Sequence, residues 1–198
     1  FPSPTQYSQL IYPLGIIDSI HPHISRGMYG VVIVDPKEGY SKDYPKPDRE
    51  YVLVQGDLFK EELNLQTSLK IRGSMRTVIN GKVFHYDPVY DSDASKFLES
   101  KPGERVRIFF ANAQINDSVA FHPIAGIWDR VLDNGNPKNI SYCMQNFTVA
   151  PAHGATFDLI SPKDRPTNNA LVDHQMKNAL TAKTPTTITL AINIALTG

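Results

Sequence analysis

Cysteine is almost missing from this chain: Cys143 is the only one among 198 residues. A single thiol excludes an internal disulfide framework and any metal site built from several cysteines. Net charge is missing too, because 20 basic residues balance 20 acidic ones. That balance argues against a nucleic-acid partner, which normally requires a basic stripe. No apolar run reaches the roughly 20 residues that cross a bilayer, so we expect no transmembrane segment.

Helical periodicity is also scarce, and a period-two pattern takes its place. In the stretch 102–137, Val106, Ile108 and Phe110 alternate with the residues between them, and a turn signal over 133–137 closes the stretch. Apolar residues make up 41% of the chain, which is enough for a substantial core. Period-two strands separated by Gly, Pro and Asn are typical of a β-sandwich. We therefore predict an all-β fold of about ten short strands.

The other expected elements follow the same reasoning. Asn80-Gly81 is a strong hairpin signal, and Trp128 is expected in the core. We expect a polar loop over 112–118 and loops over 87–101 and 161–170. Further strands are expected at 31–34, 51–55, 146–149, 156–160 and 187–194. We also expect a strand, a turn and a second strand over 76–84, and a short strand or turn over 171–174.

A polar, Pro-rich stretch over 36–50 is typical of a linker or an exposed loop. We place a boundary there, with an N-terminal segment over 1–40 and the main domain over 48–198. Because the chain begins with Phe1, we expect a processed or trimmed product. Sequons at Asn116, Asn139 and Asn146 are a weak hint of export.

His23 and Met28, with four residues between them, are the most specific candidate for metal chemistry. A blue copper centre needs two imidazoles, one thiolate and a weak thioether. This spacing is typical of the second half of the loop that carries the Cys, His and Met ligands. The alternative is packing, since Met fills core gaps and a lone His is usually just hydrogen-bonded.

A set of motifs, taken together, resembles the copper-containing nitrite reductases of the two-domain type and the related two-domain multicopper oxidases. The resemblance covers residues from about 21 to about 180. In chain order the motifs are GMYGVVIVDPKEGY, REYVLVQGDLF, INGKVF, KPGERVRIFFANA, AFHPIAGIWDRV, LDNGNPKN and VDHQMKNA.

The resemblance implies a Greek-key cupredoxin-like β-sandwich, matching the second domain of the family, with an extra N-terminal strand segment. Residues 1–40 would be a remnant of the first domain or a segment that pairs with a partner. The family is usually a trimer that works outside the cytoplasm. Its type 1 copper lies within the first domain, and its type 2 copper lies between subunits. His174 matches a type 2 ligand, and His122 matches a histidine whose role in the family is more structural.

The chain differs from the family at positions that the copper chemistry of the family requires. Pro13 and Leu14 stand where the family has a type 2 histidine and the type 1 cysteine. Ile127 stands where the family has its catalytic histidine. Leucine cannot bind copper, and neither proline nor isoleucine carries an imidazole.

Other reactive groups have simpler interpretations. Cys143, His153 and either His85 or His122 could form a relocated blue copper site, but no methionine follows His153 at the needed spacing. A buried, inert thiol within one strand fits Cys143 better. Asp57 and Asp129 flank apolar strands, and solvated or loop-capping roles fit them better than acid–base work.

Two functions follow as hypotheses. In the first, the chain is a degenerate cupredoxin with a structural or assembly role in an exported complex. In the second, it is a subunit of a copper oxidoreductase, of nitrite reductase or multicopper oxidase type, and His174 contributes to an inter-subunit type 2 copper. Either way we expect a homotrimer or a hetero-oligomer formed through the N-terminal segment, because exposed strand edges recruit partners.

Overall fold

The computed structural model describes residues 8–11, 23–59, 76–82, 98–163, 168–174 and 192–196. Strands dominate this part of the chain, and one helical turn covers residues 23–25. The strands are β1 (Ser8–Ile11), β2 (Gly30–Ile33), β3 (Arg49–Leu58), β4 (Arg76–Ile79), β5 (Leu98–Ser100), β6 (Arg105–Asn112), β7 (Val119–Pro123), β8 (Trp128–Asp133), β9 (Ile140–Met144), β10 (Phe147–Val149), β11 (Gly154–Ile160), β12 (Asn168–Asp173) and β13 (Ile192–Leu196). The all-β prediction is confirmed.

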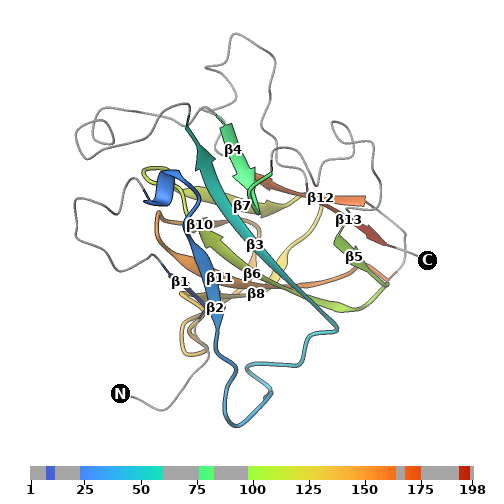
Figure 1. The fold of residues 1–198 in the computed structure, drawn as a ribbon. Helices are drawn as coiled ribbons and strands as arrows, with labels where there is room; N and C mark the ends of the chain where they lie inside the picture. Colours follow the sequence, from blue (N-terminus) through green and yellow to red (C-terminus); the bar gives the residue numbers. More distant parts are fainter. Residues whose placement is uncertain are drawn as a thin grey trace.

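Two sheets form a sandwich (Figure 1). The six-stranded sheet has the order β4-β3-β6-β11-β8-β9, and the five-stranded sheet has the order β10-β7-β12-β13-β5. Most neighbours are antiparallel, but β3 runs parallel to β6 and β13 runs parallel to β5. Residues 187–191, where we expected the last strand to begin, lie outside the described residues.

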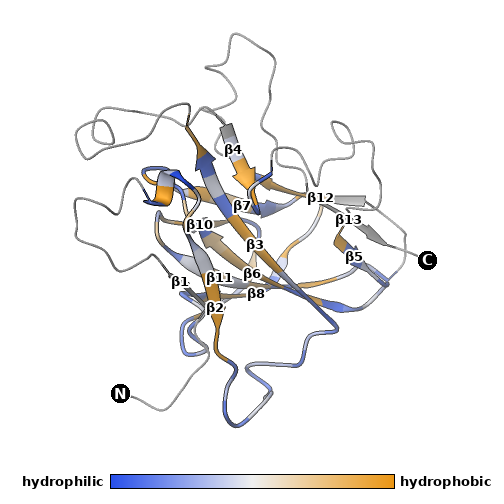
Figure 2. Ribbon diagram, in the orientation of Figure 1, coloured by the Kyte–Doolittle hydropathy of each residue, from blue (hydrophilic) through white to orange (hydrophobic). Residues whose placement is uncertain are grey.

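Aromatic side chains fill the space between the sheets. Trp128, Phe121 and Phe157 are each no more than 2% exposed. Phe121 stacks on Phe110 with ring centroids 4.5 Å apart and meets Phe157 edge-on at 5.0 Å. Hydrophobic residues run along β6 and β7, whose inner faces supply much of this core (Figure 2). Each buried aromatic contributes several kcal/mol, so this cluster fixes how the two sheets pack.

Two Asn-Gly pairs make the turns that the sequence predicts. Asn80 and Gly81 have φ values of 49° and 76°, and Asn134 and Gly135 have values of 53° and 65°. Two consecutive residues with positive φ are the requirement of a type I′ turn, whose twist matches that of the flanking strands. The Asn80 side chain also accepts a hydrogen bond from Val54 N at 2.9 Å. The turn is thereby tied to β3.

The N-terminal strands form a sheet of their own. β1 and β2 pair antiparallel, with Leu10 opposite Val31. Tyr29 and Val31 pack against Val54 and its neighbours on the six-stranded sheet. Because these apolar contacts belong to β3 and β6, the segment rests on the outer face of that sheet.

The stretch 36–50 is mostly exposed, as expected of a loop, although Tyr44 within it is 3% exposed and packs on the sheet. Three other local expectations were wrong. The expected loop over 161–170 ends in the strand β12, which begins at Asn168. The expected loop over 87–101 contains the strand β5, whose Leu98 side chain is buried. The segment around Cys143 is not one strand: β9 belongs to the six-stranded sheet and β10 to the five-stranded sheet, so the chain crosses over between Met144 and Phe147. The alternating pattern cannot show such a crossing, since it continues on both sides.

In the described ranges there is no helix long and apolar enough to cross a membrane.

Candidate functional site

His122 and His174 lie side by side on the five-stranded sheet. His122 is on β7 opposite Val172 of β12, and the backbone N–H of His174 donates to the Ala120 carbonyl at 3.0 Å. Side chains alternate along a strand, and Phe121 points into the core, so both imidazoles lie on the outer face. Their ring centroids are 5.0 Å apart with a tilt of 40°. The fold therefore brings together two histidines that are 52 positions apart in the sequence (174 minus 122).

The His122 ring has one nitrogen committed to the protein. Its Nδ1 forms a short hydrogen bond with the backbone carbonyl of Gln145, in the crossing between β9 and β10. A carbonyl oxygen only accepts, so Nδ1 carries the proton and the neutral ring has its lone pair on Nε2. A histidine held in this way is oriented and has one nitrogen available as a ligand.

His174 is exposed, and its ring makes no hydrogen bond to the residues that the structure describes. Its backbone is nevertheless held firmly by the preceding residue. Asp173 Oδ1 accepts from the Ala120 N–H at 2.9 Å, and Asp173 Oδ2 accepts from Gln55 Nε2 at 2.8 Å. The Asp173 carboxylate, on the last residue of β12, thus anchors the end of this strand to the opposite sheet.

Behind Asp173 lies a network of buried amides that sequence reasoning missed. Gln55 and Gln114 are 1% and 2% exposed, and Gln55 Nε2 donates to Gln114 Oε1 at 3.0 Å. Gln114 Nε2 in turn donates to Asp57 Oδ1 at 2.9 Å. The chain Asp173–Gln55–Gln114–Asp57 satisfies polar groups that would be costly to bury alone. The sequence does contain a sign of this network, because the polar Gln55 follows directly after the apolar run of β3.

His23 and Met28 lie around the helical turn that precedes β2. Met28 N donates to the His23 carbonyl at 3.0 Å, and the Met28 side chain is 49% exposed. His23 Nδ1 is buried without a hydrogen-bond partner among the described residues. The positions of Pro13 and Leu14 lie outside the described residues. Whether His23 and Met28 bind metal stays a prediction.

The prediction of a buried Cys143 thiol was wrong. Cys143 is exposed, on the edge strand β9, with a φ of 54°. Its neighbour Tyr142 is 52% exposed, so this part of the edge faces outward. The strand pattern gave the wrong burial for Cys143 because β9 is an edge strand, and apolar side chains on an edge strand can face solvent. In the part of the chain that the structure describes, no three or more His, Cys, Asp or Glu side chains gather as a metal site, and this includes Cys143 and His153.

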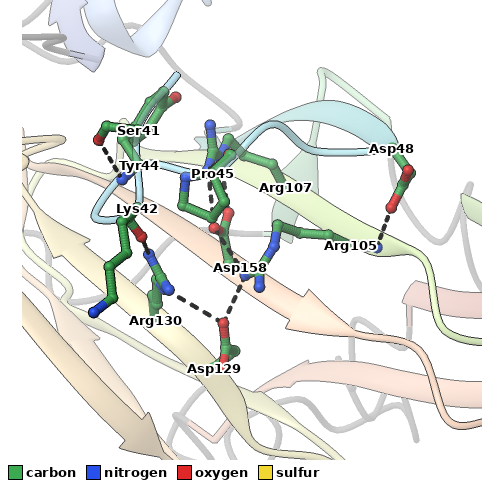
Figure 3. Close-up of polar contacts among 10 residues, drawn as sticks. All are labelled: Ser41, Lys42, Tyr44, Pro45, Asp48, Arg105, Arg107, Asp129, Arg130 and Asp158. Carbon is green, nitrogen blue, oxygen red and sulfur yellow. Dashed lines mark hydrogen bonds and ion pairs between the residues drawn. The ribbon is translucent and has the colours of Figure 1, made fainter.

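The two aspartates that flank apolar strands have separate structural roles. Asp57 accepts from Gln114, as above, and Asp129 pairs with Arg105 Nη1 at 2.6 Å. Asp129 belongs to a surface network that reaches Arg130, whose Nη1 donates to the Lys42 carbonyl at 2.8 Å (Figure 3). Each of the two carboxylates therefore has its own hydrogen-bond or ion-pair partner.

The same network fastens the 36–50 stretch to the sheet. Arg107 and Asp158, both fully buried, form two parallel hydrogen bonds of 2.7 and 2.9 Å (Figure 3). Arg107 Nη2 also donates to the Pro45 carbonyl at 2.9 Å, and its guanidinium lies 3.8 Å from the centroid of the Tyr44 ring. Burial alone would lower the pKa of Arg107, but the hydrogen bonds and charge of Asp158 outweigh it and raise that pKa. Arg107 therefore stays charged and holds Tyr44 and Pro45 against the six-stranded sheet.

His122 and His174 are candidate metal-binding histidines that the structure brings together, with ring centroids 5.0 Å apart. Neutral imidazole suits copper, zinc and nickel. Whether the two histidines bind metal stays a prediction.

Comparison with curated proteins finds similarity to copper-containing nitrite reductases. The chain is 31% identical over 179 residues to the protein of Neisseria meningitidis serogroup B, covering 87% of this chain and 42% of the relative. It is also 31% identical over 179 residues to that of Neisseria gonorrhoeae, covering 87% and 41%. The chain therefore spans less than half the length of these curated relatives. No protein-family model matches it.

Solved structures agree with the fold. The copper nitrite reductase from Nitrosomonas europaea superposes with a TM-score of 0.82 at 42% identity, over 97% of this chain and 62% of that one. A multicopper oxidase crystal structure superposes with a TM-score of 0.71 at 20% identity, over 100% of this chain and 59% of that one. The first match supports a cupredoxin-type sandwich, and the second is a likeness of fold alone.

Proposed function

Because the chain is homologous, over most of its 198 residues, to the copper-containing nitrite reductase and multicopper oxidase family, we propose that it is a subunit of a copper oxidoreductase assembly. In this proposal His174 is one ligand of a copper shared between chains. The observation that carries it is the placement of His174: exposed, at a strand end that Asp173 holds rigid, and 5.0 Å from a second imidazole.

The surroundings of His174 support a site that another chain completes. The turn that follows His122 carries Ile124 and Ile127, which are 38% and 55% exposed. Exposed apolar side chains beside a metal ligand favour burial against a partner, which would also exclude water from the copper. We propose a homotrimer or a hetero-oligomer that works outside the cytoplasm.

The chemistry is divided between the metal and the chain. When bound, copper would supply an open coordination position and one-electron redox chemistry for a small substrate, nitrite or dioxygen. The protein supplies the orientation of His174 through Asp173 and Gln55. Ile127 cannot transfer a proton, so a proton donor would have to come from another residue or another chain.

A second candidate function is that of a degenerate cupredoxin with a structural or assembly role and no redox chemistry of its own. The observation that favours it is Ile127, exposed at the position where the resemblance expects the catalytic histidine. Pro13 and Leu14 point the same way in the sequence.

The two candidates differ in activity. The natively purified protein should be supplied with a reduced electron donor, and nitrite consumption and dioxygen uptake should be followed. The oxidoreductase proposal expects turnover in the wild type and its loss in His174→Ala, with the same oligomer size by native mass spectrometry. A wild type that forms the oligomer but turns over neither substrate would favour the assembly role.

A further inference from the structure

We propose that Asn134 is a site of spontaneous deamidation, and that Asn80, in an equivalent turn, is protected from the same reaction by its hydrogen bonds to β3. The inference concerns a covalent modification of the chain itself and is independent of the proposed copper chemistry. The substrate is the side-chain amide of Asn134, and water is the co-reactant.

The reaction replaces the Asn134 amide by a carboxylate in two steps. Solvent base removes the proton of the Gly135 backbone nitrogen, and that nitrogen attacks Cγ of Asn134. A new C–N bond forms, the bond from Cγ to the side-chain nitrogen breaks, and this nitrogen takes a proton from solvent and leaves as ammonia. The product is a cyclic succinimide. Water then adds to either ring carbonyl and breaks its C–N bond, which gives isoaspartate or aspartate without any oxidation or reduction.

The two Asn-Gly pairs of the chain have the local sequence that this reaction favours. Glycine has no Cβ, so its backbone nitrogen is accessible to the asparagine side chain and the main chain can rotate into the conformation that ring closure needs. Both pairs, Asn80-Gly81 and Asn134-Gly135, form turns with two successive positive φ values. Local sequence and turn type therefore do not distinguish the two sites, and a difference between them has to come from their contacts.

Asn80 is held to the body of the sandwich. Its Oδ1 accepts from Val54 N–H at 2.9 Å, and its Nδ2 donates to the Val52 carbonyl at 3.0 Å. Its backbone N–H also donates to the Val54 carbonyl at 2.9 Å. Gly81 itself is exposed, so the protection rests on Asn80. Cγ lies between two bonded atoms, and the side chain cannot turn toward Gly81 without breaking both bonds to β3, a strand that is paired on both sides.

Asn134 has weaker restraints. Its side chain is exposed, and its Nδ2 donates to Asp133 Oδ1 at 3.3 Å, beyond the usual range of such bonds. Gly135 is buried and its N–H donates to the Leu132 carbonyl at 3.1 Å, so the turn has to open before this nitrogen reacts. That opening is local to the β8–β9 turn, and local openings of exposed turns cost less than those that reach a paired strand. Asn134 is therefore the more reactive site.

The product changes the charge of the turn. Asp133 accepts from Asn134 through Oδ1 and from Asn139 through Oδ2. Aspartate or isoaspartate at position 134 places a second carboxylate beside Asp133 in exchange for a donor, and isoaspartate also lengthens the main chain by a methylene group. The modified turn is therefore less well matched to the start of the edge strand β9.

The test is an incubation of the full, purified chain in mildly alkaline buffer made with heavy-oxygen water, followed by proteolysis in ordinary water and mass spectrometry. Heavy oxygen marks the carboxylates that form during the incubation. Asn80 is the control within the same molecules, and the chain unfolded in urea is the control for local sequence. We expect folded Asn134 to react at least about tenfold faster than folded Asn80, the order expected when one site must break two more hydrogen bonds before it reacts. We expect similar rates at the two sites in urea.

Three results would overturn the inference. The first is a folded chain in which Asn80 reacts as fast as Asn134 or faster. The second is a folded chain in which Asn134 stays intact for a time in which it reacts fully in urea. The third is the same ratio of rates in the folded and the unfolded chain, because the difference would then belong to local sequence and β3 would have no protective role.

Discussion

The hydroxyl of Tyr29 lies so close to the Cα of Gly56 that a Cβ added to Gly56 would overlap the Tyr29 oxygen. Tyr29 belongs to the N-terminal segment and Gly56 to β3, so glycine permits the segment to lie close against the sheet. Burial and the nearby Asp57 carboxylate both raise the pKa of Tyr29, with burial the larger cause. The contact joins the N-terminal segment to the six-stranded sheet.

Gly56→Ala should therefore displace Tyr29 and loosen the N-terminal segment. We expect a loss of about 1 to 3 kcal/mol in the free energy of unfolding, typical of overpacking, and faster amide hydrogen exchange across residues 29–33. Gly30→Ala is the control, because a Cβ there meets nothing within 4 Å. Tyr29→Ala in the Gly56→Ala background should recover part of the loss. Equal exchange in the two alanine variants would refute the docking role.

Asp158→Asn should be severely destabilising. It leaves the fully buried Arg107 without its charge partner, and breaking a buried pair costs about 3 to 5 kcal/mol. Urea unfolding measures this loss. Asp129→Asn is the matched control, since its side chain is 36% exposed and exposed pairs contribute less than about 1 kcal/mol. A similar small loss in both variants would show that Arg107 does not depend on Asp158.

Some of this structure follows from local sequence and some does not. The turns at Asn80 and Asn134 follow because positive φ at two successive positions requires Asn and Gly there. The core face of β6, with Val106, Ile108 and Phe110, follows from alternation. The bond between Gln55 and Asp173 does not follow, since it joins residues 118 positions apart. The exposure of Cys143 depends on β9 being an edge, and only the assembled sheet order determines that.

The candidate site divides in the same way. The motif around His122 and the one around His174 each pointed to a histidine of interest, and their resemblance to a family gave the chemistry. Their contact required the register between β7 and β12, which sequence spacing cannot supply. The role of Gln145 was also hidden, because its contribution is a backbone carbonyl and leaves no trace in residue type.

Asp173→Asn should weaken both the strand end and copper binding. Both Asp173 oxygens accept hydrogen bonds, and an amide offers only one acceptor, so Ala120 N or Gln55 Nε2 loses its partner. We expect about 1 to 3 kcal/mol of destabilisation and a Cu²⁺ affinity roughly 10- to 100-fold lower, as for other outer-sphere substitutions. Asp43→Asn, at an exposed carboxylate, is the control for charge alone. Unchanged copper affinity in a folded Asp173→Asn protein would remove its positioning role.

Glu50 should make stability depend on pH. Burial raises its pKa, with Asp35 and Asp158 adding to the effect and Arg107 partly offsetting it. The folded state thus holds the proton more tightly than the unfolded state, and stability falls as pH rises from about 4.3, the ordinary glutamate value, through the raised pKa. Glu50→Gln should match the wild type in acid and be the more stable of the two near neutrality, by urea unfolding across that range. Glu38→Gln is the control, and parallel wild-type and Glu50→Gln curves would contradict the assignment.

The copper content of the natively purified assembly, measured per chain by elemental mass spectrometry after reconstitution with excess copper, tests the central claim most directly. The account predicts about one copper or more per chain in the wild type and the loss of that copper in His174→Gln. Copper far below one per chain in the wild type, or equal copper in the variant, would contradict it and leave the chain as a cupredoxin that has kept its fold without its metal.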